Sequence, residues 1–208
     1  LEGIVCLARE VLARGREAGV PLGRLRVTVS VSSFVPKPHT PFQWEPQVSL
    51  ADLKDKQAYL AGKLRDRGIV LNYHDAGVSF IEAVFARGDR RLGRVLEKAC
   101  ALGCKFDGWS ELFRLDRWLE AFQESNLDPA WYAGRRYNYE SILPWDHISA
   151  GVSKRFLMQE HRRALAGITT KDCRAGLCTG CGLCPGLEVG PVFAGRGEFD
   201  AQLPGTVQ

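Results

Sequence analysis

A strictly alternating stretch that runs directly into a proline-rich loop places the strongest constraint on how this chain can fold. Residues 25–32 read Leu-Arg-Val-Thr-Val-Ser-Val-Ser, so the apolar side chains lie on one side of an extended strand and the polar ones on the other. Pro36, Pro38 and Pro41 exclude a helix immediately afterwards and predict an extended loop over residues 33–44. Two interpretations follow: an antiparallel strand with a solvated face, or an α/β barrel strand whose polar face lines a lumen.

Helical and extended patterns alternate around this strand. A first helix, ending near Gly19, is predicted from an apolar face formed by Ile4, Ala8, Val11 and Leu12. Ser49 and Asp52 predict the start of a second helix over residues 49–67, and a second strand follows over residues 69–74. The order helix, strand, helix, strand is typical of βαβ units with a parallel sheet, which favours the barrel interpretation.

The remainder of the chain is predicted to be mainly helical. Capping residues indicate helices that begin near Ser79, Asp89 and Ser110, and a last helix is expected over residues 152–166. The helix after Ser110 is expected to bury Leu112, Leu115, Leu119 and Phe122. Residues 131–148 are rich in aromatic side chains and follow no regular period.

Four of the seven cysteines lie within twelve residues, at the spacing C-x4-C-x2-C-x2-C. They are Cys173, Cys178, Cys181 and Cys184. Thiolates bind zinc and iron–sulfur clusters, and Gly180 and Gly182 permit the tight turns that bring such ligands together. Zinc ribbons separate their two CxxC pairs widely, whereas contiguous cysteines followed by Pro185 are closer to a ferredoxin-type run. We therefore expect an iron–sulfur cluster here, with zinc as the alternative.

The proline-rich loop carries a second set of candidate ligands. Lys37, His39, Gln43 and Trp44 follow the C-terminal end of a strand, which is where α/β barrels bind ligands. The alternative is a stiff connector whose aromatic residues plug the barrel mouth. His74 also lies near a predicted strand end, and each histidine is a possible proton-transfer group, although the sequence pairs neither with a nucleophile.

Three further features have ordinary structural interpretations. In Pro144-Trp145-Asp146-His147, Asp146 is expected to orient a neighbouring ring or to cap the last helix. Cys6, Cys100 and Cys104 are interpreted as core or helix-end residues. The pairs Arg135-Arg136 and Arg162-Arg163 could meet phosphates, but runs of two arginines are more often solvated surface.

Composition and charge exclude few classes of protein. The net charge of +4 and the pI near 8.7 permit an anionic partner such as RNA without requiring one. No apolar run approaches the ~18 residues of a membrane span, so no membrane association is expected. Clustered cysteines suit the reducing cytoplasm better than disulfides. Because the sequence begins with Leu1 inside a helical pattern, we expect a fragment that lacks the N-terminal part of the same polypeptide, and a processed start is the alternative.

Two motifs give the chain a family resemblance. Val31 to Trp44 reads Val-Ser-Ser-Phe-Val-Pro-Lys-Pro-His-Thr-Pro-Phe-Gln-Trp, and Leu143 to Ile148 reads Leu-Pro-Trp-Asp-His-Ile before the four-cysteine segment. With the segments Phe85 to Leu92 and Phe106 to Trp109, this combination resembles the C-terminal portion of radical S-adenosylmethionine (SAM) proteins that carry an N-terminal cobalamin-binding domain. The likeness is to a largely uncharacterised branch of that family and covers most of residues 1–185.

The resemblance implies an α/β fold, namely the C-terminal part of a partial (β/α) barrel, then a helical extension and a cysteine-rich segment. It divides the chain into residues 1–76, 77–168 and 169–186, with a flexible tail at 187–208. It further implies SAM bound beside a 4Fe–4S cluster, a 5′-deoxyadenosyl radical as the reagent, and cobalamin as a possible cofactor of the full-length protein. Ser30, Ser32, Lys37, His39 and Gln43 are the expected cofactor or substrate contacts.

One departure from the family separates this chain from the catalytic centre. The cluster that cleaves SAM needs C-x3-C-x2-C; Cys100 and Cys104 begin that spacing, but Asp107 occupies the third position. The sequence therefore predicts an auxiliary cysteine site, in a chain that is inactive by itself. It does not identify the catalytic residues, nor whether the substrate is a small molecule or RNA. The alternative is a zinc-stabilised RNA-binding or interaction module without catalysis.

Overall fold

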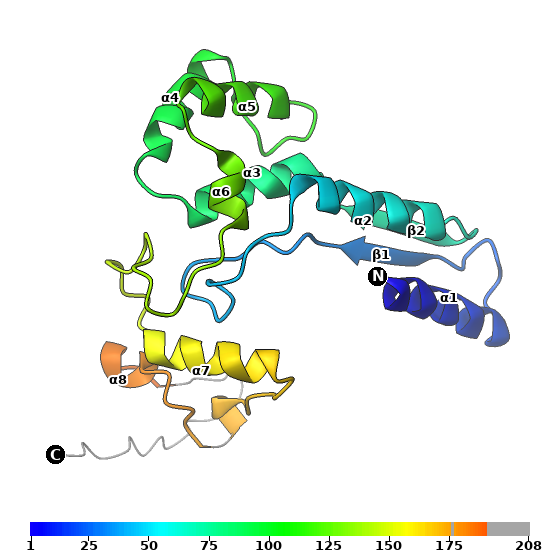
Figure 1. Cartoon of the computed structure of the whole chain (residues 1–208). Helices are drawn as coiled ribbons and strands as arrows, with labels where there is room; N and C mark the ends of the chain where they lie inside the picture. Colours follow the sequence, from blue (N-terminus) through cyan, green and yellow to red (C-terminus); the bar gives the residue numbers. More distant parts are fainter. Residues whose placement is uncertain (176, 191–208) are drawn as a thin grey trace. The chain divides into compact units, whose positions relative to one another are not determined.

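The computed structural model describes residues 1–175 and 177–190, and Figure 1 shows the order of its elements. The described part is mixed α/β. Its elements are α1 (Glu2–Glu17), β1 (Val27–Val31), α2 (Leu50–Lys63), β2 (Ile69–Tyr73), α3 (Ala76–Arg87), α4 (Leu92–Ala101), α5 (Leu115–Glu124), α6 (Pro129–Gly134), α7 (Lys154–Leu165), a 3₁₀ turn (Cys173–Ala175) and α8 (Leu183–Leu187). None of these helices is long and apolar enough to cross a lipid bilayer.

The chain forms two compact units, and each is assembled from two separate stretches of sequence. Unit 1 contains Leu1–Pro36 and Glu45–Arg136, and unit 2 contains Lys37–Trp44 and Tyr137–Gln208. Residues 37–44 of the proline-rich loop therefore pack with the C-terminal stretch of the chain, although the loop follows β1 in sequence. The expected tail segment 187–208 falls largely outside the described residues, which end at 190.

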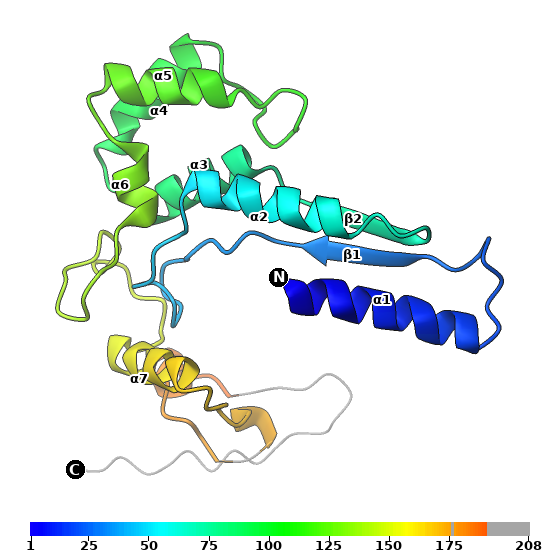
Figure 2. The same cartoon turned by 45° about the vertical axis from the view of Figure 1, so that its right-hand side comes forward.

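The predicted parallel pairing of the two strands is confirmed. β1 and β2 form a two-stranded parallel sheet whose register runs from Val27 opposite Ile69 to Val31 opposite Tyr73. Helix α2 is the crossover that parallel strands require (Figure 2). In the described residues the sheet consists of these two strands. The predicted α/β class is therefore confirmed, and the barrel remains a prediction.

The valine side of β1 faces a small apolar core. Val29 and Val31 pack with β2 residues against buried side chains of both α1 and α2. Thr28, Ser30 and Ser32 on the other side are exposed, so the alternation read from sequence corresponds to the two faces of the sheet. In α1 the buried residues are Val5, Ala8 and Leu12; the prediction that Val11 belongs to this face is wrong, because Val11 is exposed.

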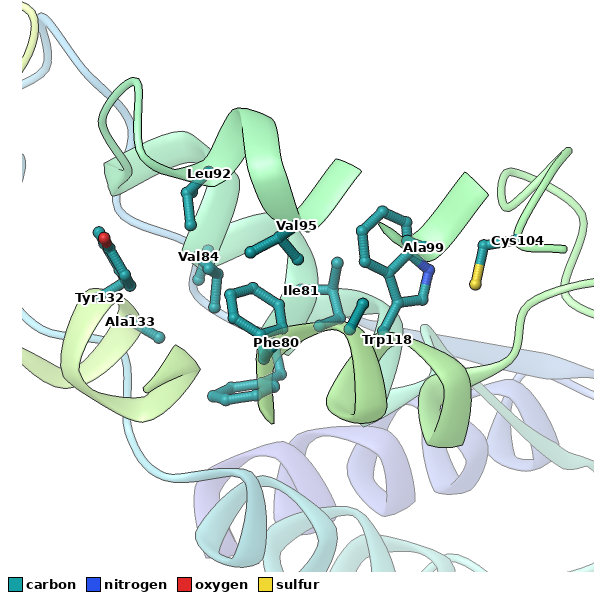
Figure 3. Close-up of a cluster of buried hydrophobic side chains, with 13 residues drawn as sticks. Phe80, Ile81, Val84, Leu92, Val95, Ala99, Cys104, Trp118, Tyr132 and Ala133 are labelled. Carbon is teal, nitrogen blue, oxygen red and sulfur yellow. The ribbon is translucent and has the colours of Figure 1, made fainter. Parts of the chain in front are cut away.

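A larger apolar cluster joins helices α3 to α6, and Figure 3 shows its side chains converging from all four helices. Val84 and Val95 are fully buried, and Phe122 is nearly so. The same unit buries one cation, because the Arg87 guanidinium donates hydrogen bonds to the main-chain carbonyls of Glu45 and Arg135. A buried guanidinium needs such acceptors. The two carbonyls lie at the start and near the end of residues 45–136, so Arg87 holds the two ends of this stretch together.

Capping predictions succeed where the cap immediately precedes the apolar period. Ser49 Oγ accepts a hydrogen bond from Asp52 N at 3.1 Å and begins α2 as predicted, although the helix ends at Lys63 rather than near residue 67. Asp75, not Ser79, caps α3, and Ser79 lies buried within that helix. The prediction for Ser110 is also wrong: α5 begins at Leu115, and Leu112 and Leu119 are exposed.

Candidate functional site

Unit 2 brings the two motifs of the resemblance together around one buried amide. The Trp145 indole Nε1 donates to Gln43 Oε1 at 2.7 Å, and the main-chain N of His39 donates to the same oxygen at 3.0 Å. Gln43 is 2 % exposed and Trp145 is also buried. His39 itself has a left-handed backbone with φ of 55°, an uncommon conformation that the hydrogen bond from its N–H to Gln43 holds in place.

Next to this amide lies an aromatic cluster that contains a buried histidine. Tyr139 Oη and His161 Nδ1 are 2.6 Å apart, and the Trp44 ring contacts both side chains edge-on or tilted. His161 is 4 % exposed. His161 was not among the predicted site residues, because its helix is predominantly charged and no motif surrounds it. Its spacing of four from Leu157, which is also buried on α7, is the one signal in the sequence.

A pocket of about 530 Å³ opens beside Gln43. Such a volume lies within the usual range for small-molecule sites. Its lining combines the proline-rich loop, the Asp146 motif and the start of α7. The lining residues are His39, Gln43, Asp146, His147, Ile148, Ser149, Ala150, Val152, Ser153, Lys154 and Leu157.

Asp146 is the acidic group in this pocket, and its charge is compensated. Lys154 Nζ donates to Asp146 Oδ2 at 2.8 Å, and Leu143 N donates to the same oxygen at 2.9 Å. Partial burial acts to raise the pKa of Asp146, but these two hydrogen bonds and the nearby His39 outweigh it and lower the pKa below the usual value. Asp146 therefore pairs with the lysine; the cap of α7 is Ser153, whose Oγ accepts from Phe156 N at 3.2 Å.

The predicted cofactor contacts are divided between the units. His39 and Gln43 line the pocket of unit 2, and Lys37 is an exposed residue of the same loop. Ser30 and Ser32 belong to unit 1, where they lie on the exposed polar face of β1. His74 is likewise an exposed residue of unit 1. Two of the five predicted contacts thus share a pocket, together with His147 and Lys154, which the prediction did not include.

The cysteine-rich segment is attached to the same unit. Ser153 N donates to the Cys181 carbonyl at 2.9 Å, immediately before α7. Gly180 N donates to Cys178 Sγ at 3.4 Å and Leu183 N donates to Cys181 Sγ at 3.5 Å. Such N–H···S contacts are typical of metal-binding thiolates. Gly180 and Gly182 both have positive φ, as expected from the predicted tight turns.

The donor set of this segment fits a metal or cluster chemically. Cys173 and Cys178 are exposed, Cys181 and Cys184 are half-buried, and all four are free thiols. Among residues 1–175 and 177–190, however, no three cysteine, histidine or carboxylate side chains are already gathered at metal-binding distance. Binding at these cysteines would therefore require the segment to close around the metal, as is common for small cysteine-ligated sites.

The remaining cysteines differ in environment. Cys104 is buried as predicted, and both its burial and the neighbouring Asp107 raise the pKa of its thiol. Cys6 and Cys100 are exposed and so are not core residues; Cys100 lies in the last turn of α4, which agrees with the predicted helix-end position. The turn after Cys104 does not extend the C-x3-C spacing into a ligand set, because Asp107 Oδ1 instead accepts a hydrogen bond from Trp118 Nε1 at 3.3 Å.

Comparisons with known proteins give one relative. The chain is 28 % identical over 102 residues to "Uncharacterized protein MJ0966" of Methanocaldococcus jannaschii, an alignment that covers 49 % of this chain and 22 % of that protein. The chain thus matches less than a quarter of the relative's length. No protein-family model matches the sequence. No solved structure matches it either.

Proposed function

We propose that this chain is part of a radical SAM iron–sulfur enzyme and contributes barrel strands, a small-molecule pocket and an auxiliary cysteine-ligated site. The observation that carries the proposal is the buried contact between the two motifs of the resemblance, in which Gln43 of the first accepts a hydrogen bond from Trp145 of the second. Residues 102 positions apart are thereby fixed in one site. A satisfied buried hydrogen bond of this kind holds the two motifs in one fixed arrangement.

The arrangement of β1, α2 and β2 also supports the proposal. A parallel βαβ unit is the repeating element of an α/β barrel, and the exposed polar face of β1 leaves Thr28, Ser30 and Ser32 free to line a lumen. In this proposal the C-x3-C-x2-C motif of the catalytic cluster, and any cobalamin domain, belong to other parts of a longer polypeptide. The substrate and the type of radical reaction are not assigned.

Cys173, Cys178, Cys181 and Cys184 would hold the auxiliary cluster. A 4Fe–4S cluster takes four thiolates, and when bound in this way it supplies redox chemistry. The chain's contribution is to supply the sulfurs and to stabilise their negative charge. Gly180 N and Leu183 N already donate to two of them, and hydrogen bonds of this kind would tune the reduction potential of a bound cluster.

Metal analysis after anaerobic iron–sulfur reconstitution tests the auxiliary site. We expect about four iron atoms and four sulfides per chain, with brown charge-transfer absorption in the visible range. A Cys178→Ser variant should lose most of the iron. Cys6→Ser is the matched control, because Cys6 is an exposed, free cysteine on α1, and it should keep the full iron content.

Two outcomes would overturn this assignment. Purification with one tightly held zinc and no capacity for iron would replace the cluster with the zinc-stabilised interaction module. Full iron content in Cys178→Ser would show that the cluster uses other ligands. Radical SAM membership is tested separately by the sequence adjoining this chain in its polypeptide, which should contain C-x3-C-x2-C.

A further inference from the structure

We propose that the unit 2 pocket binds the oxyanion group, a carboxylate or a phosphate, of a small organic molecule. This inference does not depend on the radical SAM proposal or on a metal. It rests on three features of the pocket: the NH₂ group of the buried residue Gln43, the start of the twelve-residue helix α7, and two imidazole rings. Each of them offers hydrogen-bond donors to the pocket.

The buried amide is the central feature, and its orientation is fixed by chemistry. Both groups that hydrogen-bond to Gln43 Oε1, the Trp145 indole N–H and the His39 main-chain N–H, are donors that cannot accept. The atom they contact must therefore be the amide oxygen. The NH₂ group of Gln43 accordingly lies on the other branch of the amide, and no described residue accepts a hydrogen bond from it.

Because Gln43 is 98 % buried and lines the pocket, a ligand that accepts a hydrogen bond there would satisfy this donor. An acceptor on the ligand would form a hydrogen bond that an apolar ligand cannot, so the site favours an acceptor at this position. An oxyanion offers the strongest acceptor atoms available to a small molecule.

The start of α7 adds a second set of donors. Ser153 is the N-cap, and both Ser153 and Lys154 line the pocket. The main-chain N–H groups of Lys154 and Arg155 have no acceptor among the described residues, as is usual in the first turn of a helix. With twelve residues, α7 has a substantial positive potential at this end, which favours an anion.

His39 and His147 provide the third set of donors. No described residue forms a hydrogen bond with either imidazole ring, and both residues line the pocket. The negative group of the pocket, Asp146, opposes an anion, but its oxygen Oδ2 is already bound by Lys154 Nζ and Leu143 N. Its negative charge is therefore offset in part by the lysine beside it.

The size of the pocket determines the rest of the ligand. At about 530 Å³ it is much larger than a carboxylate or phosphate alone. Ile148, Val152 and Leu157 supply apolar surface for the remaining part of the molecule. We therefore assign the pocket to a small organic anion whose oxyanion end lies at Gln43, His147 and the start of α7.

Titration of the full ¹⁵N-labelled chain with simple anions tests this assignment. The probes are sodium phosphate and sodium succinate, each compared with sodium chloride at equal ionic strength. The reporter is the Trp145 indole N–H signal, assigned by its loss in Trp145→Phe, since this group is bonded to the proposed recognition residue. We expect a saturable shift with phosphate, succinate or both, and no saturable shift with chloride. A response to one probe alone identifies the oxyanion class.

Two variants locate the site. Gln43→Glu keeps an oxygen to accept from Trp145 and His39 but replaces the NH₂ donor with a negative oxygen, so the affinity should fall at least about tenfold. His147→Ala removes an exposed ring and should weaken binding by several-fold without affecting folding. His74→Ala is the matched control in unit 1 and should bind as the original chain does.

The proposal is overturned if neither probe gives a saturable shift in the folded chain. It is also overturned if Gln43→Glu and His147→Ala both bind the probe with unchanged affinity, since binding would then occur elsewhere. If Gln43→Glu does not fold, as judged by loss of the dispersed indole signals, His147→Ala decides alone. Loss of iron binding in Cys178→Ser with unchanged anion binding would leave this inference standing.

Discussion

The two units stabilise their interiors in different ways. The larger core of unit 1 is built from apolar side chains that recur at helical spacing along α3, α4 and α5. The core of unit 2 contains two tryptophans and a tyrosine, and it borders the buried polar residues Gln43 and His161. Apolar packing tolerates many substitutions of similar volume, whereas directional hydrogen bonds between buried rings tolerate few. Unit 1 also buries polar residues, among them Gln47 and Arg87, which hydrogen-bond to main-chain carbonyls. In unit 2 the hydrogen bonds instead involve the aromatic rings of the core and its border, from Trp145 to Gln43 and between Tyr139 and His161.

Removing a large apolar side chain from unit 1 should have the largest effect on stability. Phe122 is 1 % exposed at the centre of the α3–α6 cluster. We expect Phe122→Ala to lower the free energy of unfolding by about 3–5 kcal/mol, because it combines lost burial with a cavity. Denaturant unfolding measures this change in the free energy of unfolding, and hydrogen exchange of the α3 and α5 amides shows whether the loss lies in unit 1. Phe106→Ala, at an exposed residue, is the control, and an equal loss in that variant would contradict the core assignment.

In unit 2 the loss of one hydrogen bond should be measurable without a large cavity. Trp145→Phe keeps an aromatic ring but removes the N–H that donates to Gln43 Oε1. Leaving that buried oxygen with one donor fewer should cost about 1–3 kcal/mol. Trp109→Phe is the matched control, since Trp109 is 63 % exposed, and its effect should stay within about 0.5 kcal/mol. Equal effects of the two substitutions would remove the distinction between a directional and an apolar core.

The same contrast explains which parts of the fold were predictable. The alternation of residues 25–32 and the order of helices and strands predicted a parallel pair, and β1 and β2 form it. Ser49 was identified as a cap because its signal is local. Leu112 and Leu119 were assigned to a core that does not contain them, because the period of one helix does not reveal which face its neighbours cover.

The candidate site was only partly predictable, for a related reason. His39 and Gln43 were identified from a stiff loop after a strand, and they line the pocket together. That the loop would pack with Trp145 rather than with its own strand depends on a contact between residues 102 positions apart, which no local pattern encodes. Lys154 and His147 were missed as pocket residues for the same reason, and His161 because a buried polar residue on a charged helix leaves no periodic trace.

Helix caps allow the two units to be compared with the same chemistry. Ser49 caps α2 in unit 1 and Ser153 caps α7 in unit 2, each by accepting a main-chain N–H at 3.1 and 3.2 Å. Ser49→Ala and Ser153→Ala should each lower the free energy of unfolding by about 1 kcal/mol. Replacement by glycine, which is tolerated at caps, should cost only a few tenths of a kcal/mol at either position. A much larger loss at Ser153 would show that this serine also supports the pocket or the adjoining Cys181 segment.

The smallest expected effect comes from the ion pair in unit 2, and pH reveals it. Because the folded pKa of Asp146 is lowered, its charge stabilises the fold above the ordinary aspartate pKa of 3.8, and that contribution is lost as pH falls through the lowered value. Asp146→Asn keeps an oxygen for Leu143 N and removes the charge that pairs with Lys154, so at pH 7 it should cost about 0.5–1 kcal/mol.

The contribution of the Asp146–Lys154 ion pair is checked by urea unfolding of the original chain and of Asp146→Asn, from pH 7 to below pH 3.8. The difference between the original chain and Asp146→Asn should shrink steadily below pH 3.8. Glu120→Gln, at an exposed acid of α5, should show a difference near zero at pH 7. A difference at Asp146 that is independent of pH would mean that the amide disturbs packing rather than charge, and unit 2 would then depend on the shape of this turn more than on its electrostatics.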